Sequence, residues 1–557
     1  MKPSISEKHP LYYYISTKAC YDPAKTIYVC PPEKDAGTYE DAERFAVSSG
    51  WQQIAEEDSA VLVIPIAKEG WKKESPTLLS EIFTETKGKF ASQNGKSLWG
   101  RNGFLWCWET LVFLVGYGEG ATFAGNAVVA TPGQFTAAAL VNGMPDDYAA
   151  GKKPSGHFMV PNVSGDYALK NEDIPSCLWL LLQNEEDGKE AVAYFSKTNR
   201  ITQPSLTAAF GGITTRLFAN QDEPIRQVRL SAGKFDPEPG LSKTIFHRLF
   251  ERVIRWKCGP DGKLTPFSSK EDFYASGKFT RGMVQTGGHD YEYLIHIPAG
   301  MQLKDVAGLP LVFSVHGRGE PAWMFAEKNG WDKLCDETRE FVLVVPDSPE
   351  NIWFLDRDGK AFGAMIEAVA EQYGIDRSRV YLTGFSNGGC MTREVGTAFP
   401  SLFAGLSPWN APALPNDQVD VIQAQFESGG WEMPYFFFAG DNDALALAET
   451  DKLFSRMLRV NHCAPQDKPD LVYTGEDRYT EERGYREGER MTTQVYLDRE
   501  GVPRVAMTVM KNMPHGAIHD ESRAAWEFLR RFCRPLGSRK VELIPEPETG
   551  KKLRRFP

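Results

Sequence analysis

The sequence lacks any apolar run that approaches the ~20 residues a membrane-spanning helix needs. Its opening stretch, MKPSISEKHPLYYYIS, has no long apolar segment and no small-residue cleavage site, so no signal peptide is recognised. These absences predict a cytoplasmic protein without a membrane partner. A mature secreted form whose leader has been removed is the alternative.

Closely spaced cysteines and an excess of positive charge are also missing. The nine cysteines are scattered singly, with no C-x-x-C pair, which favours reduced thiols over a disulfide framework. The net charge of -11 argues against nucleic acid as a partner, because a phosphate backbone attracts basic surfaces. No H-E-x-x-H motif is present, and we predict neither a metal nor another cofactor.

What the chain does contain is a long alternation of apolar strands and helices. A length of 557 residues exceeds one core and suggests two to four units at about 150 residues each. Continuous apolar runs such as AVLVIP (60–65) and FVLVVPD (341–347) are typical of strands covered on both faces. Predicted helices between the strands include 39–50, 242–256, 323–337 and 361–373. This order predicts mostly parallel, doubly wound α/β sheets.

The two halves of the sequence resemble each other. Residues 49–65 align with 329–346, and residues 112–143 align with 380–411, in the same order and at similar spacing. We therefore predict two tandem α/β units, with domains at 1–265 and 280–540.

The segment 379–400 contains the strongest catalytic motif. The apolar run Val380–Leu382 predicts a strand, G-x-S-x-G follows at Gly384–Gly388, and Cys390–Ala398 predicts a helix. A strand, G-x-S-x-G and a helix in succession are the context of a nucleophile elbow. The flanking glycines leave room for the sharp turn, and the helix N-terminus points at Ser386. Ser386 is therefore the predicted nucleophile.

An acid and a base follow in the order that such a serine requires. Asp443 follows the apolar run YFFFAG, and His515 follows the run VAMTVM, so each lies beyond the end of a predicted strand. Asp441 is an alternative acid in the same loop. His519 is a second histidine near the base and a conceivable metal ligand. Asp347 is expected to shape a loop instead.

Two backbone N–H groups are needed to hold the developing oxyanion. The residue after the nucleophile, Asn387, is predicted to supply one. Gly317 or Arg318, in the loop after the strand LVFSV, is predicted to supply the other. Arg318 has two further interpretations, a partner for a substrate carboxylate and a solvated surface charge. His316 is interpreted as a structural, hydrogen-bonded histidine.

The first half lacks the same set of reactive groups. Gly118 stands at the position of Ser386, and Cys30-Pro31 stands near His316-Gly317. A carboxylate, Asp187 or Glu186, aligns with Asp443, but Lys234 falls near His515. Without nucleophile and base, this half is predicted to be a catalytically degenerate copy.

The motifs HGRG, GFSNGG, GDND and PHG, in that order, resemble the polyhydroxybutyrate-depolymerase and feruloyl-esterase branch of the α/β-hydrolases. The resemblance covers about Thr280 to Phe532. Because the two halves of the sequence resemble each other, it implies that the first half is a hydrolase-like copy. It implies ester hydrolysis through Ser386, His515 and Asp443, on small-molecule or oligomeric esters of aromatic (feruloyl-type) or hydroxyalkanoate acids.

Three aromatic residues are candidates for the lining of a substrate pocket: Trp353, Phe354 and Trp409. Core packing is the alternative for each. The charged segment 465–504 is interpreted as a surface hairpin, with a lid as the alternative. Two further functions compete with esterase activity. A serine peptidase uses the same triad, and a non-catalytic binding protein would contain two degenerate copies.

Overall fold

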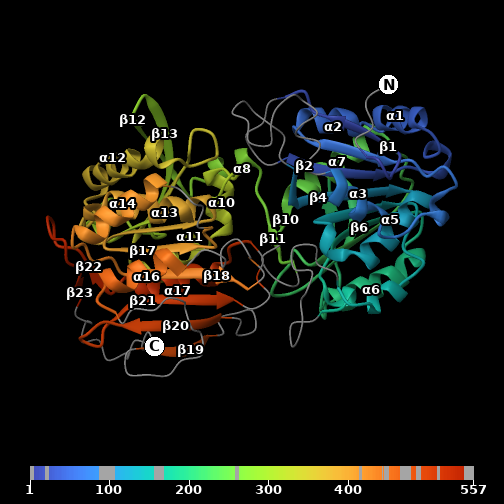
Figure 1. Ribbon diagram of the computed structural model, residues 1–557. Coiled ribbons are helices and arrows are strands. Elements are labelled where there is room, and N and C mark those ends of the chain that lie inside the picture. The colour runs from blue at the N-terminus through green and yellow to red at the C-terminus, as the bar shows by residue number, and fades with distance from the viewer. Residues whose placement is uncertain are drawn as a thin grey trace. The chain divides into compact units, whose positions relative to one another are not determined.

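The computed structural model describes residues 6–18, 24–86, 107–155, 169–256, 262–412, 417–441, 443, 451–463, 478–483, 491–510, 513 and 515–544. The chain forms two compact units, Met1–Asp272 and Phe273–Pro557. Figure 1 shows the first unit in blue to green and the second from green through yellow to red.

The second unit is built on a ten-stranded sheet of described residues. In sheet order its strands are β12 (Thr280–Thr286), β13 (His289–His296), β15 (Val342–Pro346), β14 (Leu311–Val315), β16 (Val380–Phe385), β17 (Gly405–Trp409), β18 (Tyr435–Gly440), β21 (Pro503–Met510), β20 (Met491–Leu497) and β19 (Arg478–Arg483). The strands from β15 to β21 in this order run parallel, and both edges are antiparallel.

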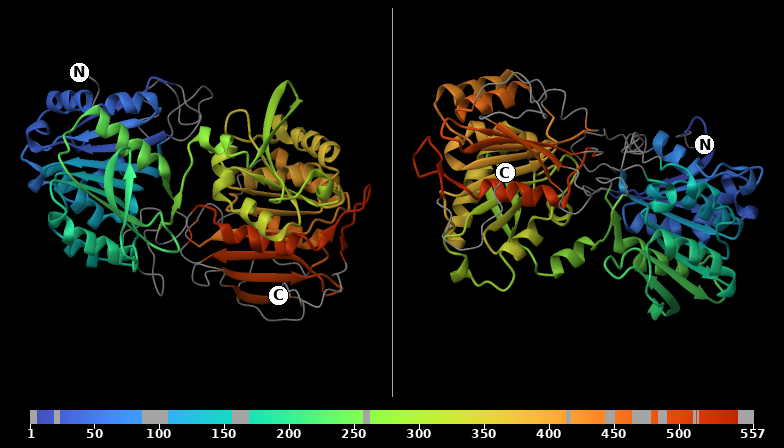
Figure 2. Two further views of the ribbon diagram at one scale, coloured as in Figure 1. Left: turned by 180° about the vertical axis from the view of Figure 1, so that it is seen from behind. Right: turned by 90° about the horizontal axis from the view of Figure 1, so that it is seen from below.

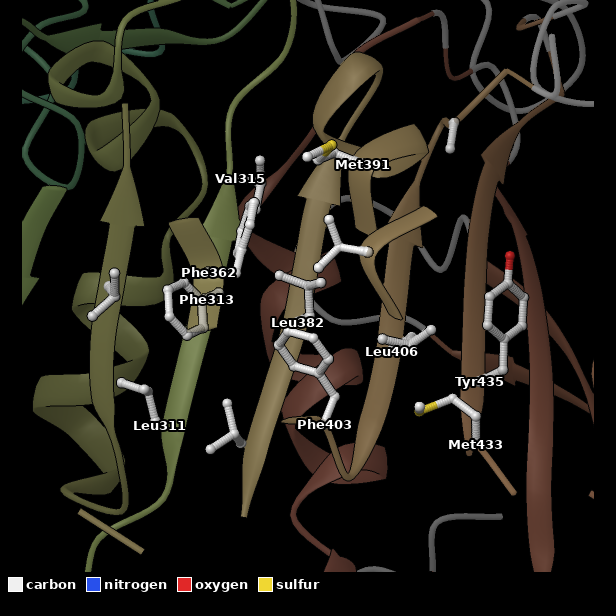
Figure 3. Packing of buried hydrophobic residues seen from close by; sticks show 14 of the residues in the cluster. Leu311, Phe313, Val315, Phe362, Leu382, Met391, Phe403, Leu406, Met433 and Tyr435 are labelled. Atoms are coloured by element: carbon white, nitrogen blue, oxygen red, sulfur yellow. The ribbon is translucent and has the colours of Figure 1, made fainter. Parts of the chain in front are cut away.

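Helices cover both faces of this sheet, as the views in Figure 2 show. Its helices are α9 (Leu303–Val306), α10 (Ala322–Lys328), α11 (Trp331–Thr338), α12 (Leu355–Tyr373), α13 (Asn387–Ala398), α14 (Asp417–Ser428), α16 (Asp451–Val460) and α17 (His519–Leu529). On one face, side chains from α12, α13, α14 and α16 join a single apolar cluster with alternate residues of the parallel strands. Figure 3 shows Phe313 and Leu382 from neighbouring strands in this cluster, with Phe362 of α12 and Met391 of α13. On the other face α11 and α17 pack through Trp331 and other aromatic residues.

The first unit repeats the same plan on a nine-stranded sheet of described residues. In sheet order its strands are β1 (Leu11–Ile15), β3 (Val61–Pro65), β2 (Ala24–Cys30), β4 (Cys107–Tyr117), β5 (Ala137–Val141), β6 (Cys177–Leu182), β9 (Gln227–Ala232), β8 (Ile213–Ala219) and β7 (Leu206–Phe210). Its helices are α1 (Tyr39–Ser48), α2 (Trp51–Glu57), α3 (Leu78–Thr86), α5 (Glu119–Ala130), α6 (Lys189–Thr198) and α7 (Pro239–Arg248), and α8 (Lys270–Ala275) lies at the boundary of the units. Two small two-stranded sheets, β10 (Val253–Arg255) with β11 (Leu264–Pro266) and β22 (Phe532–Cys533) with β23 (Glu542–Leu543), complete the described strands.

The two large sheets have the same strand order and the same pattern of parallel and antiparallel pairs, except that the second carries β12 as an extra edge strand. A tryptophan hydrogen bond also occurs at an equivalent place in both units. The Trp71 indole donates to the Pro31 carbonyl in the first unit, and the Trp353 indole donates to the His316 carbonyl in the second. The predicted fold class, two tandem α/β units, is confirmed.

Some predicted element boundaries are wrong. The helix predicted over 323–337 is two helices, because Gly330 adopts a left-handed φ of 69° between α10 and α11. The helix predicted over 242–256 ends at Arg248, and its last residues form β10. Of the segment 465–504, residues 465–477 and 484–490 lie outside the described residues. The described parts of that segment, β19 and β20, are antiparallel partners at the sheet edge.

Within the described residues, no helix combines the length and the apolar character needed to cross a lipid bilayer.

Candidate active site

Ser386 lies on a sharp turn between β16 and α13. Its backbone has φ 55° and ψ -119°, a left-handed conformation that is costly for a residue with a side chain. The Ser386 N–H donates to the Trp409 carbonyl at 2.9 Å, which ties the turn to the neighbouring strand. A Cβ at Gly384 would collide with the Gly388 carbonyl, and one at Gly388 with the Val315 carbonyl. The glycines at these two positions therefore permit the elbow.

The structure brings Ser386, His515 and Asp443 into one hydrogen-bond chain. His515 Nδ1 lies 2.6 Å from Asp443 Oδ2, and His515 Nε2 lies 2.7 Å from Ser386 Oγ. A carboxylate can only accept, so the proton lies on Nδ1, and Nε2 accepts the bond from the serine hydroxyl. Asp443 is 3% exposed, whereas about a third of the His515 side chain remains accessible. A buried carboxylate thus orients the imidazole, and part of the imidazole remains accessible to solvent.

The sheet explains why residues far apart in sequence meet here. Strands β18 and β21 are parallel neighbours, with Gly440 opposite Met510 at their carboxyl ends. Asp443 and His515 follow these two ends. Asn410 joins the two loops, because its side chain accepts from the Gly440 N–H at 2.7 Å and donates to the Gly516 carbonyl at 2.6 Å. Sequence analysis missed Asn410, since an asparagine after a strand is a common turn residue.

The competing acids and base have other contacts. Asp441 accepts from the Met513 N–H at 3.3 Å. Asp347 accepts from the Ala322 N–H at 3.2 Å. The His519 ring lies against Gly330 at the start of α11. No group of three or more His, Cys, Asp or Glu side chains suited to a metal occurs among the described residues.

The predicted oxyanion loop adjoins the serine. A Cβ built on Gly317 would lie 3.4 Å from Ser386 Cβ, so the Gly317 backbone passes directly beside the nucleophile. Asn387 is the first residue of α13, where backbone N–H groups have no partner within the helix. Its side-chain oxygen accepts from the Trp353 N–H at 2.7 Å and fixes that loop against the helix. Arg318 is exposed.

The three predicted pocket aromatics have different positions. Trp409 is fully buried, stacks on Trp331 and donates to Ser407 Oγ, so it belongs to the core beneath the elbow and does not line an open pocket. Trp353 is 2% exposed and is also part of the core. Phe354 is 42% exposed and is the one of the three with a large accessible surface.

Two further side chains, His316 and Cys390, lie near the site. The Ser348 N–H donates to His316 Nε2, so Nδ1 carries the proton and donates to the Gly317 carbonyl at 2.7 Å. His316 is therefore hydrogen-bonded within the predicted oxyanion loop and to the Ser348 backbone. One turn after the serine, burial raises the pKa of the Cys390 thiol, although the neighbouring Arg393 opposes this effect.

The corresponding turn of the first unit has the same backbone but different groups. Gly118 has φ 56° and ψ -123°, nearly the dihedral angles of Ser386. The loop that faces it contains Pro31 and Pro32, which have no N–H to donate. The carboxylate of Glu119 accepts from the Glu33 N–H at 3.3 Å. The elbow shape is therefore present in both units, but the serine is not.

Sequence comparisons find partial relatives. Poly(3-hydroxyalkanoate) depolymerase C of Paucimonas lemoignei is 33% identical over 127 residues, which are 20% of this chain and 29% of that protein. Feruloyl esterase B of Thermothelomyces thermophilus is 27% identical over 106 residues, 17% of this chain and 36% of that protein. The chain thus spans about a third of the length of these curated relatives. The resemblance to polyhydroxybutyrate depolymerases and feruloyl esterases is confirmed over that part.

Among solved structures, an acetyl xylan esterase from Aspergillus awamori matches with a TM-score of 0.34 and 16% identity, covering 44% of this chain and 98% of that one. No protein-family model matches the chain.

Proposed function

We propose that the chain is a carboxylic-ester hydrolase in which Ser386 is the nucleophile, His515 the general base and Asp443 the group that orients the imidazole. The observation that carries the proposal is the hydrogen-bond chain from Asp443 through His515 to Ser386 Oγ, with distances of 2.6 and 2.7 Å. A serine hydroxyl is a weak nucleophile until an adjacent base removes its proton. An aligned histidine and a buried carboxylate provide that activation.

The reaction follows from these positions. His515 Nε2 takes the hydroxyl proton as Ser386 Oγ attacks the ester carbonyl, and the Asp443 carboxylate stabilises the imidazolium that forms. The carbonyl oxygen becomes negative as the tetrahedral intermediate forms, and the N–H groups of Asn387 and of Gly317 or Arg318 hold it. His515 then protonates the leaving alcohol. Water, activated by the same imidazole, releases the acid from the acyl-enzyme.

The proposed substrates are esters of aromatic, feruloyl-type acids or of hydroxyalkanoic acids. The names of the two sequence relatives support these acyl classes. The exposed ring of Phe354, one residue beyond the Trp353 backbone that Asn387 holds, supports an apolar contact for the substrate beside the serine.

We propose that the first unit, residues 1–265, has no hydrolytic activity. Its elbow carries Gly118, and Pro31 and Pro32 remove N–H donors from the facing loop. The Glu119 carboxylate, at the position of Asn387, accepts from the Glu33 N–H of the facing loop. Catalysis is proposed for the second unit alone, residues 280–540.

A fluorophosphonate probe and a substrate panel test this function. We expect the probe to label the wild-type protein and not Ser386→Ala, and we expect hydrolysis of p-nitrophenyl esters to exceed that of p-nitroanilide peptides. Amide cleavage without ester cleavage would assign a peptidase. An unlabelled wild-type protein, or undiminished labelling of Ser386→Ala, would assign a non-catalytic protein.

A further inference from the structure

A buried ion pair lies in the second unit close to the elbow. Lys328 Nζ, at the end of α10, is 3.0 Å from Glu320 Oε1, and the residues are 8% and 1% exposed. Glu320 directly follows the predicted oxyanion loop His316–Gly319. Charges are costly to bury and are retained in a protein interior only when they are paired. The pair therefore fixes the end of that loop to α10.

The lysine also contacts the residue that precedes the serine. Lys328 Nζ lies 4.2 Å from the centre of the Phe385 ring, in a cation–π arrangement. The imidazole of His515 also packs against the Phe385 ring, and the two ring centres are 5.0 Å apart. A Cβ built on Gly317 would come within 3.0 Å of the same ring. Phe385 thus links the ion pair to the proposed base and to the oxyanion loop.

The first unit provides an internal comparison. Gly50 and Gly330 both adopt left-handed φ, and each precedes a helix that begins with a buried tryptophan. Counting back from these glycines places Ser48 where the second unit has Lys328. Ser48 is exposed, whereas Lys328 is buried.

The aromatic contacts of this region occur in both units, but the lysine does not. Phe45 packs edge-on against Tyr117 in the first unit, as Phe325 stacks on Phe385 in the second. The aromatic pair therefore belongs to the shared fold. Lys328 stands only in the unit that carries Ser386.

We propose that the Glu320–Lys328 ion pair is a positioning element of the ester-hydrolase site: it holds the Phe385 ring as the support of the His515 imidazole and fixes the end of the oxyanion loop. This inference rests on the proposed function, because positioning has meaning only if His515 acts on Ser386. Neither charged residue touches the reacting atoms. Their effect is on the alignment of His515 with the serine hydroxyl, so it is expected in kcat and not in KM.

Steady-state hydrolysis of p-nitrophenyl acetate tests the proposal in the full chain. Lys328→Met keeps the length of the side chain and removes its charge, and we expect kcat to fall about 10- to 100-fold, as for a catalytic group displaced by a fraction of an ångström to about 1 Å. KM is expected to stay within about threefold, since the substrate contacts are intact. Lys328→Arg retains a cation for Glu320 and for the ring, and should restore most of kcat.

Arg504→Met is the matched control. Arg504 lies 3.0 Å from Asp498 in a partly buried ion pair of the same unit, at the opposite end of β21 from His515. This variant should lower Tm without lowering kcat. Glu320→Gln is nearly isosteric and should reproduce the loss of kcat if Lys328→Met does not fold.

The outcomes separate this proposal from the proposed function. Wild-type kcat in Lys328→Met or Glu320→Gln would overturn the positioning role while ester hydrolysis stands. A loss in Lys328→Met that Lys328→Arg does not restore, or that Arg504→Met matches, would also overturn it. A wild-type protein that neither hydrolyses the ester nor reacts with a fluorophosphonate would overturn the proposed function itself.

Discussion

Asp441 and Asp443 lie two residues apart but accept hydrogen bonds from different partners. Asp443 accepts from the His515 ring and is almost fully buried, whereas Asp441 accepts from the Met513 backbone. From the sequence Asp443 is the predicted acid and Asp441 the alternative, because both follow the same strand and carry the same charge. Only the direction of each side chain distinguishes their roles.

Substitution of these aspartates should therefore give different results. Asp443→Asn removes the negative charge that stabilises the imidazolium and can place an NH₂ donor against Nδ1, which favours the wrong His515 tautomer, so we expect kcat to fall by about 10³- to 10⁴-fold, as in other triads. Asp441→Asn, the matched control, should retain kcat within about tenfold, because an amide oxygen still accepts the backbone bond. Kinetics with a p-nitrophenyl ester measure both, and equal losses would contradict the assignment of the acid.

Cys390 offers a second test at single-residue scale. Burial raises the pKa of its thiol and leaves little thiolate to react. We expect iodoacetamide at about pH 8, near the ordinary thiol pKa, to leave Cys390 unmodified in the native protein and to alkylate it in denaturant, as peptide mass spectrometry would show. Rapid native alkylation together with loss of esterase activity would argue that this thiol is reactive in the folded site.

Among the elements, the turn from β16 to α13 is set by close backbone contacts. The path of the chain leaves no room for a Cβ at Gly388, which faces the carbonyls of Val315 and His316. The sequence predicted this elbow because the required glycines are part of a motif. It did not predict the break between α10 and α11, since Gly330 has no such pattern around it. The sequence left the position of Trp409 open between pocket and core for a related reason: a tryptophan after a strand has the same sequence context whether it lines a pocket or packs beneath it.

Gly388→Ala should consequently destabilise the second unit by about 1–3 kcal/mol or more, because backbone carbonyls cannot move aside as a side chain can. Gly363→Ala is the control. It lies inside α12, where an added Cβ meets only a Leu402 methyl at 3.6 Å, so we expect a gain of roughly 0.5–1 kcal/mol from helix propensity. The temperature at which fluorophosphonate labelling of Ser386 is lost reports on both. A tolerated alanine at position 388 would contradict the close approach.

On the scale of the whole molecule, one fold occurs twice and the proposed catalytic groups occur once. The sequence revealed the duplication because apolar strands and glycine turns keep their order and spacing. It did not reveal that the two elbows share nearly identical dihedral angles at Gly118 and Ser386. Backbone geometry is retained by packing even where the reactive side chain differs.

A serine alone should not activate the first unit. In the Ser386→Ala background, Gly118→Ser has space for its Cβ, whose nearest neighbour is Pro32 Cβ at 3.8 Å. It still faces prolines without N–H groups and the Glu119 carboxylate. We expect no fluorophosphonate labelling of this double variant above that of Ser386→Ala. Labelling of the hydroxyl introduced by Gly118→Ser would show that the first unit holds a working base and oxyanion site.

The shared strand order has a consequence for how the chain reaches its native state. When both units are unfolded together, a strand such as β9 meets two sets of neighbours with the same polarity and order, so pairing across units competes with correct pairing. Synthesis from the N-terminus reduces this competition, because the strands of the first unit emerge before those of the second. Refolding of the whole chain from denaturant is therefore expected to give a lower yield of native protein than refolding of a single sheet would, because strands can pair with the wrong unit.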